Sequence, residues 1–297
     1  MKEIVIISGK GGTGKTSLTA SFAVLCGNEA VTADCDVDAA DMHVFLQPDR
    51  AYREDFYSGR LAVIDPRRCI DCGKCADVCR FDAIRVIRGH HSVQAMDCEG
   101  CGYCARICPA RAIAQVGNHV GWWYESGIRT GSDMIHARMK VGAENSGKLV
   151  AKVKKEARRV AEAKQRELIL VDGSPGIGCP VVSSLSGADY VLMVTEPSVS
   201  GRHDLERLYA LVEKFRLPAG CVINKADLNP GKRDEIAAFL KEKQIDHIAD
   251  LPYDLAFSTA MVKGKTIVEE GEPALRMKVE SAWRKIRDKV NQNHKGR

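Results

Sequence analysis

The sequence predicts an α/β fold in which a host domain is interrupted by a short cysteine-rich insert. Strand-like apolar stretches alternate with helix-like stretches near the start of the chain, and the same alternation resumes in its second half. Between these two parts, eight cysteines fall within residues 69–108. The host domain is therefore discontinuous, with residues 1–60 and 117–297 on either side of an insert at 61–116.

The predicted elements of the host begin with a strand at Glu3–Ser8, a helix at Lys15–Cys26 and a short strand at Ala30–Asp34. The second half continues with strands at 168–172, 190–195 and 220–224 and with helices at 148–167, 202–215, 232–243 and 274–290. Strands that alternate with helices favour a mostly parallel sheet flanked by helices.

The composition restricts the class of protein. The chain has 297 residues, 45% of them hydrophobic, which suffices for one large or two modest domains. Mean hydropathy is −0.20, and no apolar run approaches the roughly 18 residues of a membrane span. The N-terminus lacks a signal-peptide pattern, so we expect a cytoplasmic protein. In that compartment thiols stay reduced, and twelve cysteines then indicate metal ligands rather than disulfides.

Residues 9–16 carry the pattern G-x-x-x-x-G-K-T between the first predicted strand and the first predicted helix. Glycines let backbone N–H groups turn toward phosphate oxygens at a helix N-terminus, Lys15 supplies a charge for the β- and γ-phosphates, and Thr16 offers a hydroxyl to Mg²⁺. The sequence thus predicts that a nucleotide and Mg²⁺ bind to Gly9, Lys10, Gly11, Gly12, Thr13, Gly14, Lys15, Thr16 and Ser17.

The second lysine of this loop carries a family resemblance. The run Lys10-Gly-Gly-Thr-Gly-Lys15-Thr16 resembles the deviant P-loop of the MinD/ParA and nitrogenase iron protein (SIMIBI) class of dimeric ATPases. The resemblance implies a P-loop NTPase fold, ATP or ADP as the nucleotide, and a homodimer formed with ATP. It also implies that Lys10 reaches across to the partner's nucleotide.

The same resemblance assigns roles further along the chain. Asp36 resembles the first-switch carboxylate that orients the attacking water, and Asp172 resembles the second-switch aspartate that holds Mg²⁺ through water. Lys10, Lys15, Asp36 and Asp172 are then the catalytic set. Asn224 and Pro252 match segments beside the base. Roles for Asp38, Asp41 and Asp227 stay open, and because Asn224-Lys-x-Asp227 also resembles the guanine-reading motif of GTPases, GTP stays open too.

The insert is a sequence repeat. Its first unit contains Cys69, Cys72, Cys75 and Cys79, and the second, 29 residues later, contains Cys98, Cys101, Cys104 and Cys108. Each unit has the spacing C-x2-C-x2-C-x3-C of bacterial two-cluster ferredoxins, in which the fourth cysteine ligates the other cluster. We therefore expect a small α+β ferredoxin-like domain with two [4Fe-4S] clusters. One cluster would take Cys69, Cys72, Cys75 and Cys108, and the other Cys98, Cys101, Cys104 and Cys79.

Some features of the cysteine pattern leave alternatives. Pro109 follows the last cysteine of the second unit as in ferredoxins, but Arg80 follows that of the first. Zinc is the competing metal, although its sites usually pair two C-x2-C hooks. Cys179 lies seven residues after Asp172, where the nitrogenase iron protein carries a cluster ligand, and its role stays open. Cys26 and Cys221 are expected in the core, and His90 and His91 in an exposed hairpin without a role.

The combined resemblance implies an ATPase switch joined to two [4Fe-4S] clusters, acting in electron transfer or in iron-sulfur or metal-cofactor assembly with a redox or metallo-cofactor protein partner. One alternative is a ferredoxin-type carrier with a structural nucleotide. Another is a MinD-like positioning ATPase at a membrane, for which an apolar stripe is the candidate: Leu275, Val279, Trp283, Ile286 and Val290. Such a stripe is more typical of a helix that packs on its own domain.

The net charge of +5 is unevenly distributed. Residues 273–297 contain eight Lys or Arg against two acids, residues 66–111 contain eight against five, and the remainder is acidic. If each oxidised cluster with four thiolates adds about −2, the insert becomes nearly neutral. We therefore expect no nucleic-acid partner.

Overall fold

The chain forms two compact units. The structure, a computed structural model, describes residues 1–143 and 146–292. The first unit contains Met1–Glu54, Trp123–Arg138 and the chain from Ser146 onward, and the second contains Asp55–Trp122 with the segment that begins at Met139. The excursion from the host thus starts earlier and ends later than the insert expected at residues 61–116.

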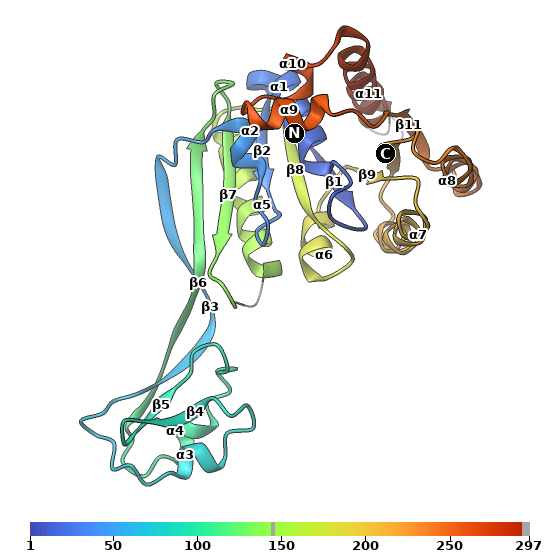
Figure 1. The fold of residues 1–297 in the computed structure, drawn as a ribbon. Helices are drawn as coiled ribbons and strands as arrows, with labels where there is room; N and C mark the ends of the chain where they lie inside the picture. Colours follow the sequence, from blue (N-terminus) through green and yellow to red (C-terminus); the bar gives the residue numbers. More distant parts are fainter. Residues whose placement is uncertain (144–145, 293–297) are drawn as a thin grey trace. The chain divides into compact units, whose positions relative to one another are not determined.

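A nine-stranded sheet organises the fold, in the order β11-β10-β9-β1-β8-β2-β7-β6-β3 (Figure 1). Strand β1 lies between β8 and β9 and is parallel to both, and β2 and β10 extend the parallel sheet on either side. These central strands span Lys2–Ser8 (β1), Ala30–Asp34 (β2), Leu168–Pro175 (β8), Tyr190–Thr195 (β9), Ala219–Ile223 (β10) and Asp246–Asp250 (β11). Except in the edge strand β11, their residues are buried almost throughout, as expected for a parallel sheet covered on both faces.

The other edge of the sheet was not expected from the sequence. Strand β7 (Asp133–Met139) is parallel to β2, and β6 (Ile113–Gly127) and β3 (Tyr52–Ile64) follow it. A turn of five residues joins β6 to β7, so these neighbours run antiparallel. The unit boundaries at Asp55 and Trp122 fall within β3 and β6, which carry the chain out of the first unit and back.

Helices cover both faces of the parallel part of the sheet. Figure 1 shows α1, α9, α10 and α11 on one side and α5, α6 and α7 on the other. The first group comprises α1 (Lys15–Cys26), with the 3-10 turn Gly27–Glu29 after it, α2 (Met42–Leu46), α9 (Ala256–Val262), α10 (Ile267–Glu270) and α11 (Pro273–Gln292). It shares one apolar core with β1, β8 and β9. The remaining helices are α5 (Ser146–Ala163), α6 (Cys179–Leu185), α7 (Val199–Lys214) and α8 (Pro230–Glu242).

The apolar stripe of α11 belongs to this core. Leu275, Val279, Ile286 and Val290 are buried, and the Trp283 ring stacks on Phe22 of α1 with the ring centroids 5.0 Å apart. The expected packing of this helix on its own domain is confirmed, and the stripe is not available to a membrane surface. No helix in the described part of the chain is long and apolar enough to cross a bilayer.

The sequence repeat of the second unit is also a structural repeat. Residues Asp71, Gly73 and Asp82 have positive φ, and so do Gly100, Gly102 and Arg111, which lie 29 positions later. Gly73 and Gly102 precede two short helices, α3 (Lys74–Asp77) and α4 (Tyr103–Ile107), which contact each other. Strands β4 (Ile84–Ile87) and β5 (His90–Val93) form an antiparallel hairpin between the two copies.

The second unit has a small core in which cysteines replace larger apolar residues. Its buried cluster consists of Ala62, Cys75, Ile84 and Ile113, and four further cysteines pack against it. All twelve cysteines of the chain are free thiols, so no disulfide supports this unit. Small domains with so little apolar core usually need disulfides, bound metal or another stabilising link.

Candidate functional site

The loop between β1 and α1 has the backbone of a phosphate-binding site. Gly12 and Gly14 have positive φ, and Gly14 is the N-cap residue of α1, where helix N–H groups point outward. A Cβ atom on Gly14 would collide with the amide of Asn224, so both the conformation and the close approach require glycine here. The helix that follows begins at Lys15, as predicted.

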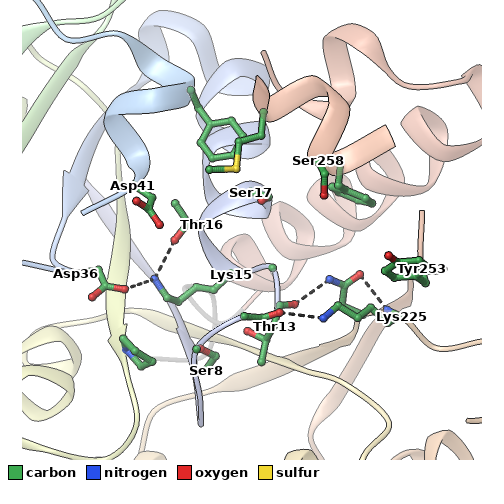
Figure 2. A pocket seen from close by; sticks show the side chains of 18 of the residues that line it. Ser8, Thr13, Lys15, Thr16, Ser17, Asp36, Asp41, Lys225, Tyr253 and Ser258 are labelled. Atoms are coloured by element: carbon green, nitrogen blue, oxygen red, sulfur yellow. Dashed lines mark hydrogen bonds and ion pairs between the residues drawn. The ribbon is translucent and has the colours of Figure 1, made fainter. Parts of the chain in front are cut away.

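A cavity of about 490 Å³ lies above this loop (Figure 2). The predicted residues Gly11 to Ser17, Asp36, Asn224 and Pro252 all line it. Asp41 also reaches its wall, whereas Asp38 and Asp227 do not. Gly9 and Lys10 are absent from the lining, so the structure does not bring Lys10 to the cavity of its own chain.

Asp172 is the buried centre of the polar site beneath the cavity. Its carboxylate, within β8, accepts hydrogen bonds from Thr16 Oγ1 at 2.8 Å and Thr19 Oγ1 at 2.9 Å. The Lys15 ammonium lies 3.0 Å from the same carboxylate and 3.4 Å from Asp36 Oδ2. Figure 2 shows Lys15 extended between Asp36 and Thr16.

The site holds three carboxylates against one ammonium. Burial opposes the charge of Lys15, but Asp172 and Asp36 outweigh that effect and raise the pKa of the lysine. Burial raises the pKa of Asp36, and burial together with the charge of Asp172 raises the pKa of Asp34 well above its usual range. Carboxyl groups whose pKa values are raised in this way suit a cation-binding site, because a bound cation favours their charged form.

Two buried oxygens at the site have no hydrogen-bond partner within the described residues: Asp34 Oδ2 and Thr13 Oγ1. A buried polar atom without a partner costs free energy, so such atoms mark a place where a ligand completes the bonding. The carboxylates and the Thr16 hydroxyl are the oxygen donors that Mg²⁺ prefers. The residues present therefore fit a Mg²⁺ ion with phosphates.

At the opposite end of the cavity, Asn224 braces the phosphate loop. Its Nδ2 donates to Thr13 O at 2.8 Å, and its Oδ1 accepts from Lys225 N at 3.0 Å. Asp227 is turned to the next loop, where it accepts a hydrogen bond from Tyr253 N at 2.6 Å. The carboxylate that would read guanine is thus outside the cavity wall.

Two smaller cavities in the second unit sort the eight predicted cysteines into two sets. Cys69, Cys72, Cys75 and Cys108 line one, and Cys79, Cys98, Cys101 and Cys104 line the other. Each set combines three cysteines of one repeat with the fourth cysteine of the other, which is the crossed grouping that the spacing predicts. Burial raises the pKa of the Cys75 and Cys104 thiols.

Within residues 1–143 and 146–292, no three His, Cys, Asp or Glu side chains gather in the geometry of a single metal ion. His90 and His91 both contact the Asp71 carboxylate, and His91 also lines the Cys69 cavity.

Comparison with known proteins adds an independent assignment. Residues 4–267 match the family model described as the CobQ/CobB/MinD/ParA nucleotide-binding domain. The chain belongs to this family.

Two relatives come from Methanocaldococcus jannaschii, and both are described as uncharacterized. Protein MJ0578 is 38% identical over 230 residues, which cover 76% of this chain and 79% of the relative. Protein MJ0579 is 28% identical over 278 residues, which cover 91% and 93%.

Solved structures of the family share the fold. The septum site-determining protein MinD of Pyrococcus horikoshii OT3, complexed with Mg-ADP, is 16% identical with a TM-score of 0.57, over 98% of both chains. The MinC:MinD cell division complex of Aquifex aeolicus gives 16% identity and a TM-score of 0.58, over 97% of this chain and 96% of that one. The names of these structures correspond to the positioning alternative rather than to an iron-sulfur protein.

Sequence reasoning missed four residues of this CobQ/CobB/MinD/ParA site: Thr19, Asp34, Glu196 and Lys225. Thr19 lies three residues after Thr16, on the same face of α1, and that helical spacing was the available signal. Asp34 ends β2 two residues before Asp36. The charged groups of Glu196 and Lys225 lie 2.9 Å apart. No local sequence signal predicts this pair, because the two residues follow separate strands that the parallel sheet places side by side.

Proposed function

We propose that this member of the family is an ATP-hydrolysing dimeric switch coupled to two [4Fe-4S] clusters, acting in nucleotide-gated electron transfer or in iron-sulfur or metal-cofactor assembly. The observation that carries the proposal is the presence in one chain of a phosphate loop beside three buried carboxylates and of two crossed sets of four cysteines. Twelve free thiols favour a cytoplasmic location.

The first unit supplies the residues for ATP hydrolysis. Backbone N–H groups of Gly11 to Gly14 would bind phosphate oxygens, and Thr16 with Asp172 would hold Mg²⁺, the latter through water. When phosphates enter, Lys15 can turn from the carboxylates toward them. Asp36 then loses its ammonium partner and becomes free to orient the attacking water.

Two observations favour ATP over GTP. Asp227 is bonded to Tyr253 N and lies outside the cavity, so the carboxylate that a guanine-reading motif needs is not presented. The Asn224 amide is already bonded to the phosphate loop. Nucleotide competition measures this choice directly: ATP should displace a fluorescent ATP analogue at concentrations at which GTP does not.

The second unit supplies the cluster ligands, grouped as its two cavities group them. The clusters would provide one-electron transfer when bound. Cys72 and Cys101 are exposed, so each set has one ligand at the surface where a redox or metallo-cofactor partner can approach. The buried cluster of this unit contains only four residues, so we expect the unit to depend on the clusters for folding.

The test of the cluster assignment is the metal content of protein prepared without oxygen. We expect about eight iron per chain. Cys72→Ser should lose about half of it, whereas Cys179→Ser, which changes an exposed cysteine outside both sets, should lose none. A colourless protein with stoichiometric zinc would refute the iron-sulfur part of the proposal. A loss of iron in Cys179→Ser would mean that Cys179 is a further cluster ligand.

The test of the ATPase assignment is turnover. Lys15→Ala should abolish ATP hydrolysis, whereas Lys241→Ala, on the exposed face of α8, should not change it. Unchanged hydrolysis in Lys15→Ala would refute the assignment of the catalytic site. Tight ATP binding without hydrolysis in the wild type would instead favour a ferredoxin-type carrier with a structural nucleotide.

The names of the similar solved structures favour one second candidate, a MinD-like positioning ATPase. The apolar stripe of α11 is buried against Phe22 and its neighbours, so a membrane-binding surface would have to come from other residues. Flotation with anionic liposomes decides this candidate. ATP-dependent flotation would support it, and protein that stays at the bottom of the gradient with ATP would exclude it.

A further inference from the structure

The Lys10 side chain is bound to the start of α7 and not to the nucleotide cavity. Its ammonium lies 2.6 Å from Glu196 Oε1, and it donates hydrogen bonds to Ser200 Oγ at 2.9 Å and Ser198 Oγ at 3.2 Å. Glu196 follows β9 directly, and Ser198 is the N-cap of α7. Three oxygens of the same chain therefore satisfy the Lys10 ammonium.

Glu196 is shared between two lysines. Its Oε2 lies 2.9 Å from Lys225 Nζ, which also donates to Gly12 O at 3.0 Å. Burial opposes the charge of Glu196, but the two ammonium groups outweigh it and hold the pKa of the carboxyl below its ordinary value. If the Lys10 ammonium moves away, the Glu196 carboxylate still pairs with Lys225. The movement therefore does not leave the half-buried charge of Glu196 without a partner.

The backbone beside Lys10 has little freedom to move. A Cβ atom on Gly9 would overlap the Cβ and backbone of Asp204, so α7 lies directly against the loop at this point. Ser8 Oγ also donates to Lys10 O at 2.8 Å. A change in the position of the Lys10 ammonium therefore has to come from rotation of its side chain.

We propose that Glu196 and Ser200 form a latch that holds Lys10 on its own chain and must open before Lys10 can reach the nucleotide of a second copy. The proposal rests on the dimeric switch proposed above and adds its control. With the latch closed, the charge of the Lys10 ammonium is neutralised by Glu196 of the same chain. That charge is then not available to attract the nucleotide bound to a second copy of the chain. Glu196 is thus a positioning residue for Lys10.

The closed latch can be tested on the nucleotide-free full chain without reference to a dimer. An amine-reactive reagent at limiting concentration labels Lys10 at a rate that mass spectrometry of the peptide measures. Glu196→Gln should raise this rate about 2- to 5-fold, the effect of removing one partly exposed ion pair. Glu206→Gln, which removes a carboxylate of α7 that pairs with Arg202, should leave it unchanged. An unchanged rate in Glu196→Gln would overturn the latch.

The control of dimerisation is tested by sedimentation of the full chain with ATP and Mg²⁺. Glu196→Gln should dimerise at a protein concentration about 2- to 5-fold lower than the wild type does. Ser200→Ala should lower this dimerisation concentration by a smaller factor. In a Lys10→Ala background, Glu196→Gln should have no effect, because the group that it releases is gone. Thermal melting establishes that each variant is folded.

The outcomes separate the latch from the proposed function. If the wild type dimerises with ATP but Glu196→Gln dimerises at the same or a higher concentration, Glu196 does not restrain Lys10 and the latch is refuted. If the wild type remains monomeric with ATP although Glu196→Gln accelerates labelling, the dimeric switch itself is wrong, and control of dimerisation by the latch falls with it.

Discussion

Asp172 is the residue on which the polar groups of the nucleotide site converge. Two hydroxyls and one ammonium bond to its carboxylate, which has no exposed surface. A buried carboxylate is tolerated only with such partners, since the desolvation cost is otherwise several kcal/mol. Two of the three partners, Lys15 and Thr16, are also the groups expected to meet phosphate and Mg²⁺, so ligand binding must redistribute these bonds.

Thr19 is the partner of Asp172 that is not expected to contact phosphate or Mg²⁺. We predict that Thr19→Val lowers the free energy of unfolding by about 2 kcal/mol, because it removes a hydrogen bond to a buried charged group. Thr19→Ser keeps the hydroxyl and should stay close to the wild type. Urea unfolding of the three proteins measures the difference, and equal stability of Thr19→Val and the wild type would show that the bond to Asp172 contributes nothing.

His136 is a buried histidine in the first unit, outside the nucleotide site. Its ring stacks on Tyr124 and bonds to Ser126 Oγ, and burial, with smaller contributions from Arg50 and His43, lowers its pKa to about 4. The unfolded chain takes up a proton below about pH 6.5, where native His136 stays neutral. The free energy of unfolding should therefore fall as the pH drops from about 6.5 to 4, by as much as about 3 kcal/mol.

The matched variants for this prediction are His136→Gln and His203→Gln, since His203 is exposed on α7. Only His136→Gln should flatten the dependence of stability on pH within that window. Chemical denaturation at several pH values provides the curves. Parallel curves for the wild type and His136→Gln would mean that another group causes the acid sensitivity.

At the scale of elements, periodicity predicts some parts of this fold better than others. The phosphate loop, α1 and β2 agree with the sequence because buried parallel strands are continuous apolar runs and the helix has a fixed start at Gly14. Strand β3 escaped prediction because nearly all its residues are exposed or half-buried, from Tyr52 to Ile64, so no apolar run or regular alternation marks it. The long β6 has the same mixed pattern.

Helix α11 combines an apolar face in the core with a basic face in solvent. We predict that Trp283→Ala lowers the free energy of unfolding by about 3–5 kcal/mol, because it removes a large buried ring that stacks on Phe22. The neighbouring Arg284→Ala should change it by no more than about 0.5 kcal/mol, since that side chain is exposed. Thermal and urea unfolding measure both. A small effect of Trp283→Ala would contradict the placement of this stripe in the core.

At the scale of the whole molecule, the sequence predicts the residues that line the nucleotide cavity better than it predicts how the units connect. The spacing of the cysteines reflects local loops around Gly73 and Gly102, whereas the crossed grouping in the two cavities requires the two repeats to pack together through α3 and α4. Unit boundaries depend on which distant segments pair. The segment from Met139 joins the second unit through contacts such as Lys140 N with Val120 O, which no local pattern encodes.

The path of the chain suggests how the two sites could influence each other. The chain passes between the units within β3, within β6, at the last residue of β7 and at the start of α5. Helix α5 follows the last of these crossings in the sequence and packs against α6, the helix after Asp172. Buried Lys154 of α5 donates to the carbonyl oxygens of Ser184 and Ser186 at the end of α6. A rearrangement at Asp172 would therefore reach α5, the helix that follows the second unit in the sequence.

On the basis of the proposed function, we predict that the nucleotide changes the reduction potential of at least one of the two proposed clusters. In redox titrations of the anaerobic full chain, a non-hydrolysable ATP analogue with Mg²⁺ should shift a potential by on the order of 60 mV relative to ADP, a factor of ten for one electron. Lys15→Ala should abolish the shift while it retains the iron. Equal potentials in all nucleotide states would leave two independent sites on one chain, and the nucleotide would then be a structural ligand of an electron carrier.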